Sequence, residues 1–218
     1  MLELMKIDLL ACPEALGESC VKEAYDALEE KFAGDYIKES FDGKVPASVK
    51  LKDFTEKDSF ENAQHTKIYY IVDAEPQAKI SYSGNSEEII SGDSFSAGEN
   101  EEVFFSDASV IEIGGEVFLA EGVKRIEAET VREGKGNYKT DFLKSDGFNV
   151  SKHKIKEKTG FVSTKKSLDI IIITEGRARM FYDGASLAVN KGECILVPAY
   201  IGKYTVEGNC EFLRVDFI

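Results

Sequence analysis

Hydrophobic and polar residues alternate, or gather in short β-rich runs, along most of the chain after Gly43. Such runs predict strands, and turn-forming sequences such as Ser83-Gly84-Asn85 and Gly114-Gly115 separate them. The polar stretch 121–141 divides the strands into two series and is interpreted as a connection. Many short, closely spaced strands favour a sandwich or barrel. The predicted strands are 48–51, 68–72, 78–82, 102–105, 110–113, 116–120, 148–154, 168–174, 177–182, 186–189, 194–197, 202–206 and 211–217.

Only the N-terminal part of the chain has a helical pattern. Between Pro13 and Phe32, apolar residues recur at helical spacing with Glu and Lys between them. Pro13 suits a first helical turn, and Gly34 supplies a stop. The sequence therefore predicts an N-terminal helical segment over 1–45, followed by one β domain over 46–135 and a second over 136–218.

Composition and charge narrow the function classes. Hydrophobic residues make up 43% of the chain and charged residues 31%, as in ordinary globular proteins. A net charge of −13 argues against nucleic acid or an anionic membrane as a partner. The N-terminus lacks the pattern of a secretory signal, so a cytoplasmic location is expected. The four cysteines form no CxxC pair and are expected to be free thiols.

The C-terminal segment carries a family resemblance. Residues 168–217 resemble the C-terminal barrel of type I mannose-6-phosphate isomerases, which are members of the cupin superfamily. The similar features include the strand closing on Glu175-Gly176, the hairpin at Asp183-Gly184, and Gly192 followed six residues later by Pro198. The resemblance implies an all-β fold of two cupin barrels (double-stranded β-helix, or jelly roll) with a short N-terminal helical segment.

Three segments in the middle of the chain extend this resemblance. Residues 65–76, His-Thr-Lys-Ile-Tyr-Tyr-Ile-Val-Asp-Ala-Glu-Pro, are similar to a family segment that reads Lys-Thr-Glu-Cys-Trp-Tyr-Ile-Leu-Asp-Ala-Glu-Pro. Residues 46–53 and 106–115 resemble two further strands of the family. The similarity then covers about residues 46–218.

The family binds one zinc ion through a Gln, two His and a Glu. The resemblance places Lys50, Lys52, Lys67 and Ile111 at those four positions. A protonated amine has no lone pair for a metal, so we expect no metal cofactor. The chain has two histidines in all, His65 and His153, and His65 is a weak candidate ligand because it lies close to Lys67.

The resemblance also implies positions in the second barrel. There the family's acidic position falls at Asp169, and a cupin histidine position falls near Lys203. Residues 162–165, ahead of Asp169, contain no histidine. The family's lid arginine corresponds to Arg132 with a one-residue shift.

These substitutions predict a mannose-6-phosphate isomerase-like cupin that has lost zinc-dependent isomerase activity. Lysines that point into the barrel would form a cationic pocket for a small anion, such as a sugar phosphate or another anionic metabolite. Alternation alone instead places Lys50 and Lys52 in solvent, with Val49 and Leu51 in the core. An acidic residue that pairs with the lysines would simply fill the pocket. The candidate ligand-binding residues are Lys50, Lys52, Lys67, Glu112, Glu121 and Arg132.

Two other function classes remain open. The chain could be an active enzyme that interconverts mannose 6-phosphate and fructose 6-phosphate, or a catalyst that uses a lysine of lowered pKa. It could also be a structural module that self-associates into a homo-oligomer through a barrel edge or its N-terminal helix. Relocated metal ligands for an active isomerase would come from His65, Glu61, Glu112, Glu121 or His153.

Overall fold

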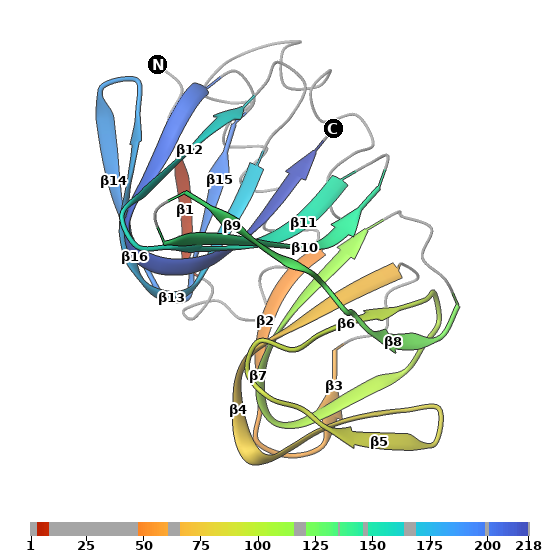
Figure 1. The fold of residues 1–218 in the computed structure, drawn as a ribbon. Coiled ribbons are helices and arrows are strands. Elements are labelled where there is room, and N and C mark those ends of the chain that lie inside the picture. The colour runs from red at the N-terminus through yellow and green to blue at the C-terminus, as the bar shows by residue number, and fades with distance from the viewer. Residues whose placement is uncertain are drawn as a thin grey trace. The chain divides into compact units, whose positions relative to one another are not determined.

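The structure is a computed structural model that describes residues 4–8, 48–60, 66–115, 121–134, 136–145, 148–163, 169–198 and 201–217. In this part of the chain the regular structure is entirely β (Figure 1). The predicted helix between Pro13 and Phe32 lies outside the described residues. No helix in the described part has the length and apolar character needed to cross a membrane.

The chain divides into two compact units. The first contains residues Pro46–Glu127, and the second contains the residues from Ala128 onward together with strand β1 (Met5–Asp8). The sequence pattern put this boundary after residue 135. Strand β9 (Thr130–Glu133) lies with the second unit because it pairs with β10 (Asn137–Lys144).

The first unit is a bent antiparallel sheet in the order β2-β7-β4-β6-β8. Its two long strands change partners midway: the first half of β4 pairs with β6 and the second half with β5. Irregularities in the β4–β7 register, between Ile71 and Asp73 and between Ala74 and Lys79, mark the bend. The bounds are β2 (Ser48–Phe54), β3 (Asp58–Ser59), β4 (Thr66–Tyr82), β5 (Asn85–Glu88), β6 (Ser94–Ala97), β7 (Val103–Gly115) and β8 (Val123–Arg125).

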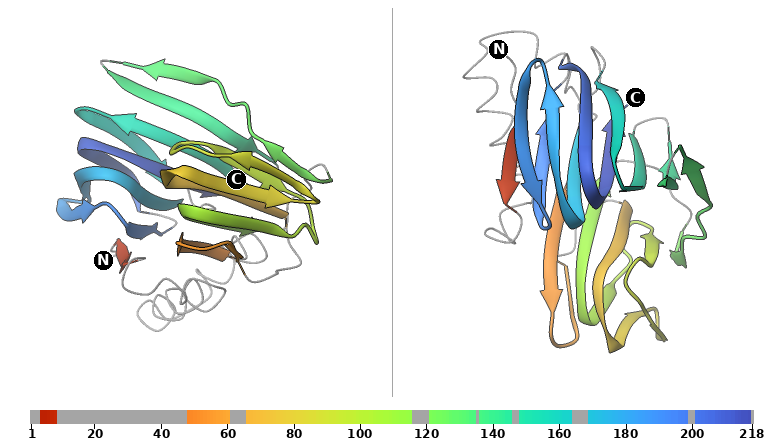
Figure 2. Two further views of the ribbon diagram at one scale, coloured as in Figure 1. Left: turned by 90° about the horizontal axis from the view of Figure 1, so that it is seen from below. Right: turned by 60° about the vertical axis from the view of Figure 1, so that its left-hand side comes forward.

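The bend lets the two halves of this sheet enclose one core. Tyr69 and Ile71, from the first half of β4, pack in the same cluster as Ile80 from its second half. Aromatic rings fill much of the cluster: Phe54 lies 5.4 Å from Phe105, centroid to centroid. The curved sheet is visible in both views of Figure 2.

The second unit repeats this plan with nine strands in the described part. The first half of β13 pairs with β15 and its second half with β14, while β16 pairs first with β12 and then with β11. The strand β1 extends the sheet by pairing with β15. The remaining bounds are β11 (Phe148–Ile155), β12 (Lys158–Ser163), β13 (Asp169–Tyr182), β14 (Ala185–Asn190), β15 (Glu193–Val197) and β16 (Gly202–Phe217).

Gly176 makes the bend in β13 possible. Its φ is +75°, and a Cβ atom there would lie 2.3 Å from the Asn209 carbonyl oxygen of β16. A side chain at this position would therefore both strain the backbone and separate the two long strands. The Glu175-Gly176 pair noted in the sequence is thus the bend of the barrel.

Two features of the strand prediction need correction. Several strands predicted separately are halves of one strand: 68–72 and 78–82 both belong to β4, and 168–174 and 177–182 both belong to β13. The stretch 121–141, interpreted as a connection, contains β8, β9 and the start of β10. These strands have little hydrophobic alternation, and all four residues of β9 are exposed. Cross-strand hydrogen bonding, rather than burial, therefore holds β9 in place.

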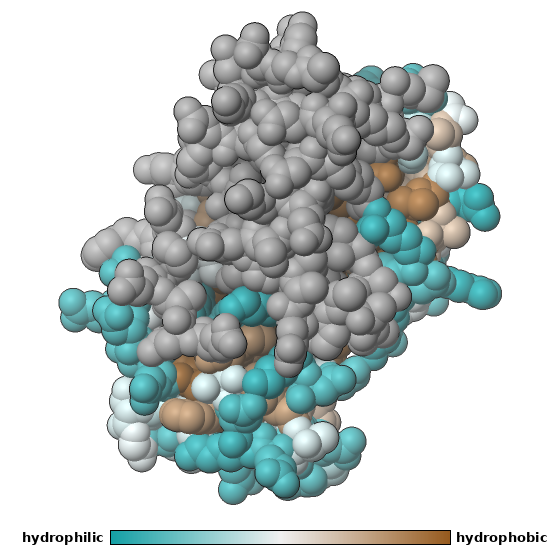
Figure 3. Space-filling model, turned by 180° about the vertical axis from the view of Figure 1, so that it is seen from behind, coloured by the Kyte–Doolittle hydropathy of each residue, from teal (hydrophilic) through white to brown (hydrophobic). Residues whose placement is uncertain are grey.

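The surface and the cysteines are consistent with the composition. Hydrophilic residues predominate over the described part of the face in Figure 3, with smaller apolar patches between them. Cys194 and Cys210 are buried and form no disulfide within the described residues. Burial raises the pKa of the Cys210 thiol to about 12, so it is not an activated nucleophile.

Candidate functional site

The interior of the first barrel contains a cluster of charged residues on three neighbouring strands. Glu112 lies on β7, and its register partners are Lys50 on β2 and Tyr69 on β4. Alternate residues of a strand share a face, so Lys52 and Lys67 lie on this same face. The face is the barrel interior, because Tyr69 belongs to the hydrophobic core. The structure therefore brings three predicted lysines and Glu112 to one side of the sheet.

Alternation in β2 gave the opposite expectation, that these lysines face solvent. Val49 and Leu51 are indeed buried, with 1% and 6% of their surface exposed, but on the other face of the strand. Both faces of β2 are covered, and this is why alternation could not assign the interior. Lys67, at 4%, is nearly as buried as a core residue.

Glu112 has an unusual environment for a buried carboxylate. Its side chain is completely buried, with Oε1 3.9 Å from the Lys50 Nζ and Oε2 3.8 Å from the Lys67 Nζ. These separations are longer than hydrogen bonds, and no donor among the described residues is in good hydrogen-bond geometry with either oxygen. The Tyr69 hydroxyl is near enough to interact weakly with the carboxylate and favour its charged form. The cluster thus has two cations and a phenol near one weakly bonded carboxylate.

Burial shifts the titration of this cluster toward neutral side chains. It raises the pKa of Glu112, although the two lysine charges oppose the change. It also lowers the pKa of Lys67, and the Lys50 charge acts in the same direction while Glu112 opposes it. Burial, with the Glu112 charge beside it, raises the pKa of Tyr69 well above its usual value. A neutral amine and a neutral carboxylic acid are therefore more accessible here than in water.

A cavity of about 300 Å³ opens beside this cluster. Lys52 and Lys67 both line it, but Lys52 is fixed at the mouth, where its Nζ donates to Asp58 Oδ2 at 2.7 Å and to the Ser59 carbonyl at 2.9 Å. Lys67 has no such close carboxylate. The other lining residues are Asp58, Ser59, Phe60, Tyr69, Glu101, Glu102, Val103 and Phe104.

The other candidates lie elsewhere. Glu121 is exposed and lies in the bend that precedes β8. Arg132 is exposed on β9, in the second unit, and its Nε donates to the Gly134 carbonyl at 3.2 Å. Ile111 lies on the face of β7 opposite to Glu112, so Glu112 is the residue of this strand that faces the lysines. His65 lies outside the described residues.

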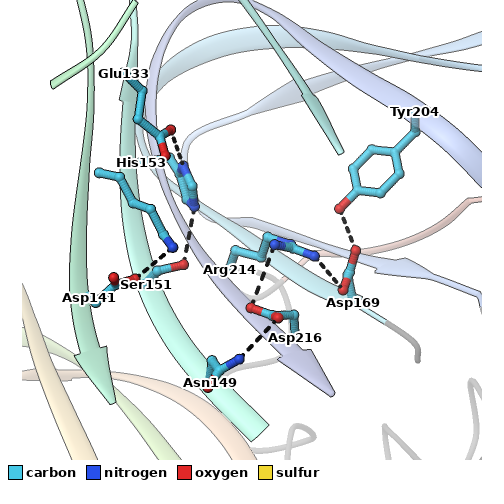
Figure 4. A network of polar contacts seen from close by, with 10 residues as sticks. Glu133, Asp141, Asn149, Ser151, His153, Asp169, Tyr204, Arg214 and Asp216 are labelled. Carbon is cyan, nitrogen blue, oxygen red and sulfur yellow. Dashed lines mark hydrogen bonds and ion pairs between the residues drawn. The ribbon is translucent and has the colours of Figure 1, made fainter. Parts of the chain in front are cut away.

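The second barrel contains a polar network that the sequence prediction missed apart from Asp169 (Figure 4). The Asp169 side chain is fully buried; its Oδ2 accepts a 2.5 Å hydrogen bond from the Tyr204 hydroxyl, and its Oδ1 accepts one of 3.1 Å from Arg214 Nη2. Arg214 also lies 3.6 Å from Asp216, which Asn149 contacts in turn. Burial raises the pKa of Asp169, against the opposing charge of Arg214.

His153, on β11, belongs to a second polar group of this barrel, with Ser151 and Glu133 (Figure 4). Its ring stacks on Phe212 with centroids 5.1 Å apart, and Nε2 lies 3.1 Å from the Ser151 hydroxyl. Burial lowers the pKa of His153 to about 3, so the ring is neutral near neutral pH. The sequence contained one indication of the buried polar residues. Arg214 and Asp216 follow Phe212 at intervals of two in β16, so they share a strand face with a core residue.

The comparisons with known proteins agree with this architecture. Residues 138–217 match the family model described as "Mannose-6-phosphate isomerase, cupin domain". The solved mannose 6-phosphate isomerase of Bacillus subtilis superposes with a TM-score of 0.67 over 88% of this chain and 81% of its own, at 19% identity. Residues 138–217 are therefore similar to the cupin domain of mannose-6-phosphate isomerases, and the chain has the cupin fold.

Two further similarities refine the picture of this cupin. The probable mannose-6-phosphate isomerase GmuF of Bacillus subtilis (strain 168) is 29% identical over 103 residues, which cover 47% of this chain and 32% of GmuF. The match thus spans about a third of that curated relative. The structure of protein Ylba from E. coli, at 14% identity and a TM-score of 0.59, covers 78% of this chain and 75% of its own. At that identity the similarity shows the shared fold alone.

The residues in the first barrel do not fit the zinc ion of the resembled enzymes. Zinc takes lone pairs from His, Cys or carboxylates. Glu112 is a single carboxylate here, and the ammonium groups of Lys50 and Lys67 face it and would repel a divalent cation. Among the described residues, no group of three or more His, Cys, Asp or Glu side chains is placed to hold a metal.

Proposed function

We propose that this cupin has lost zinc-dependent isomerase activity and binds an anionic carbohydrate, or a similar small polar metabolite, in the cavity of its first barrel. The observation that carries the proposal is Lys67: it lines the cavity, it is almost completely buried, and the resemblance places it at a family zinc ligand. A scaffold that retains the cavity but replaces a ligand with a buried cation favours an anion there.

The mixed charge of the cavity lining supports a ligand with hydroxyl groups as well as an anionic group. Asp58 and Glu102 are exposed, so water screens their charges, and their carboxylates can accept hydrogen bonds from hydroxyls. Lys67 is shielded from water, and there an ion pair is stronger. We therefore assign the anionic group of the ligand to Lys67 and its hydroxyls to the carboxylates near the mouth.

Calorimetric titration with mannose 6-phosphate, and with the carbonyl-free sugar-alcohol phosphate derived from it, tests this binding. We expect both to bind, and Lys67→Met to weaken each by about tenfold to a hundredfold, because one buried charge-assisted contact contributes about 1.5–3 kcal/mol. Lys79→Met is the matched control, since Lys79 is an exposed lysine of the same strand. Equal affinity in the wild type and Lys67→Met would contradict the assignment.

The loss of isomerase activity has a separate test. Purified protein is analysed for metal and then assayed, with and without added zinc, for conversion of mannose 6-phosphate to fructose 6-phosphate. We expect no stoichiometric zinc and no turnover above background. Zinc bound at one equivalent together with turnover would establish an active isomerase with relocated ligands and overturn the proposal.

A further inference from the structure

Lys67 and Lys52 line the same cavity in contrasting states. Lys52 Nζ has two close acceptors, Asp58 Oδ2 at 2.7 Å and the Ser59 carbonyl at 2.9 Å, and its side chain is 39% exposed. Lys67 is 4% exposed, and its carboxylate neighbour, Glu112, is 3.8 Å away. Hydrogen bonds to a carboxylate hold a lysine in its charged form, whereas burial enlarges the neutral fraction that is in equilibrium with the charged form. The charged form of Lys67 is the one that would hold an anion, and the neutral fraction is the one that can act as a nucleophile.

We propose that Lys67 forms a reversible imine with the carbonyl group of a small aldehyde or ketone that enters the first-barrel cavity. The inference uses the cavity of the proposed function but does not require that the ligand be anionic. The proposed reaction is covalent. It takes place at Lys67, which occupies the position of a zinc ligand in the resembled isomerases. Open-chain sugars and short hydroxy-aldehydes are the carbonyl compounds that this polar cavity suits.

The reaction consumes no oxidant or reductant. The lone pair of the Lys67 Nζ forms a bond to the carbonyl carbon, while the carbonyl π electrons move to oxygen, which takes up a proton. The amine proton is lost, and a carbinolamine results. The nitrogen lone pair then forms the C=N bond as the C–O bond breaks, and the hydroxyl takes up a proton and leaves as water. The nitrogen gives up its remaining proton, so that the neutral imine results. Amine and carbonyl thus give imine and water.

Two neighbours adapt Lys67 to this reaction. Glu112, which has no donor in good hydrogen-bond geometry among the described residues and only the Tyr69 hydroxyl nearby, is placed to carry protons between the amine and the leaving hydroxyl. Lys50 lies on the other side of Glu112, and its positive charge disfavours a second charge at Lys67. A lysine made nucleophilic by burial and by a nearby cation is a recurring arrangement for imine chemistry. The remaining charged groups at the cavity, Asp58, Glu101 and Glu102, line its wall.

Reductive trapping tests the proposal on the whole protein. The protein is incubated briefly with glycolaldehyde, a small neutral aldehyde, and cyanoborohydride, and the modified peptides are then mapped by mass spectrometry. We expect Lys67 to be modified first, ahead of Lys52 in the same cavity and of the exposed Lys79. Modification spread over the exposed lysines in order of exposure, with Lys67 unmodified, would overturn the proposal.

Two variants sharpen the result. Lys67→Arg retains the positive charge but cannot form the imine, and we expect it to remove the fast-trapped adduct without creating a new one. Glu112→Gln keeps the shape of the side chain, and we expect it to slow trapping at Lys67 by about a hundredfold, the usual contribution of a positioned general acid or base. Unchanged trapping at Lys67 in Glu112→Gln would contradict the role given to Glu112.

The probes separate this inference from the proposed function. The sugar-alcohol phosphate has no carbonyl and reports anion binding alone, while glycolaldehyde has no anionic group and reports imine formation alone. Binding of the sugar-alcohol phosphate without trapping of glycolaldehyde leaves the anion site intact and removes the imine. Trapping of glycolaldehyde at Lys67 without binding of the sugar-alcohol phosphate would support the imine and remove the anion site.

Discussion

Each barrel buries one carboxylate beside cations, but the two carboxylates are bonded differently. In the second barrel, Asp169 accepts hydrogen bonds of 2.5 Å from Tyr204 and 3.1 Å from Arg214. In the first, Glu112 has two lysines at 3.8 and 3.9 Å and no donor in good hydrogen-bond geometry among the described residues, with only a weak interaction from the Tyr69 hydroxyl. The first of these clusters adjoins the cavity of about 300 Å³ described above.

The difference shows how one fold can use its interior in two ways. A buried polar network whose members bond one another rigidifies a core. An unsatisfied buried group costs stability, and such costs concentrate at functional sites. The second barrel is thus interpreted as having a polar core in which both oxygens of Asp169 are bonded, although the Arg214 Nε has no acceptor among the described residues. In the first barrel, the weakly bonded Glu112 is consistent with the proposed ligand site.

The largest expected effect comes from breaking the hydrogen bonds to Asp169 in the second barrel. Asp169→Ala leaves the Arg214 guanidinium and the Tyr204 hydroxyl without their buried acceptor, and we expect it to lower the free energy of unfolding by about 3–5 kcal/mol. Urea unfolding followed by circular dichroism measures the loss. The double variant Asp169→Leu with Arg214→Met removes both charges and should recover most of it. A loss in Asp169→Ala below about 1 kcal/mol would mean that the network contributes little.

The next effect is an acid sensitivity centred on His153. Burial lowers its pKa from 6.5 to about 3, with Arg214 and Lys139 adding to the shift and Asp141 opposing it. A lowered pKa means that His153 binds a proton more weakly in the folded protein than in the unfolded chain. The stability from this group is therefore fully present above pH 6.5 and is lost as the pH falls toward about 3.

His153→Phe should remove that sensitivity while keeping the stack on Phe212. We expect the wild type to lose about 1.4 kcal/mol per pH unit more than the variant within this window. The difference between the two urea-unfolding curves, measured at several pH values, isolates His153 from carboxylates that titrate in both proteins. Parallel pH profiles would show that His153 is protonated equally in the folded and unfolded chains.

The sequence allowed much of the fold to be predicted, because strand patterns and the Gly-rich bends are local. Alternation and the Glu175-Gly176 pair located the strands and the bend of β13. The sequence could not show that the predicted strands join in pairs to form β4 and β13, because a bulge depends on the pairing with the partner strand. It also missed β9, whose exposed residues have no apolar pattern.

The candidate site was only partly predictable for a related reason. The resemblance identified Lys50, Lys52 and Lys67, but their direction depends on which faces of β2 and β4 are the interior. Both faces are buried at the start of β4, and in β2 the face opposite the lysines is the more buried one. The resemblance assigned the last ligand position to Ile111, whereas the register places Glu112 opposite Lys50. A register difference of one residue moves a side chain to the other face, and a sequence alone does not fix it. Arg214 and Tyr204 are far from Asp169 in the chain, so only the folded sheet brings them together.

The smallest expected effect is the loss of the weakly bonded carboxylate. Glu112→Ala removes only a weak interaction with the Tyr69 hydroxyl, and Lys67, whose pKa burial already lowers, can lose its proton when its counter-charge disappears. We therefore expect a loss of about 1–2 kcal/mol in the free energy of unfolding, well below that of Asp169→Ala. The same urea titration measures both. A loss as large as that of Asp169→Ala would place Glu112 in a structural ion pair and remove the distinction between the barrels. A small loss would mean that the fold does not depend on this carboxylate, as expected for a group retained for a ligand.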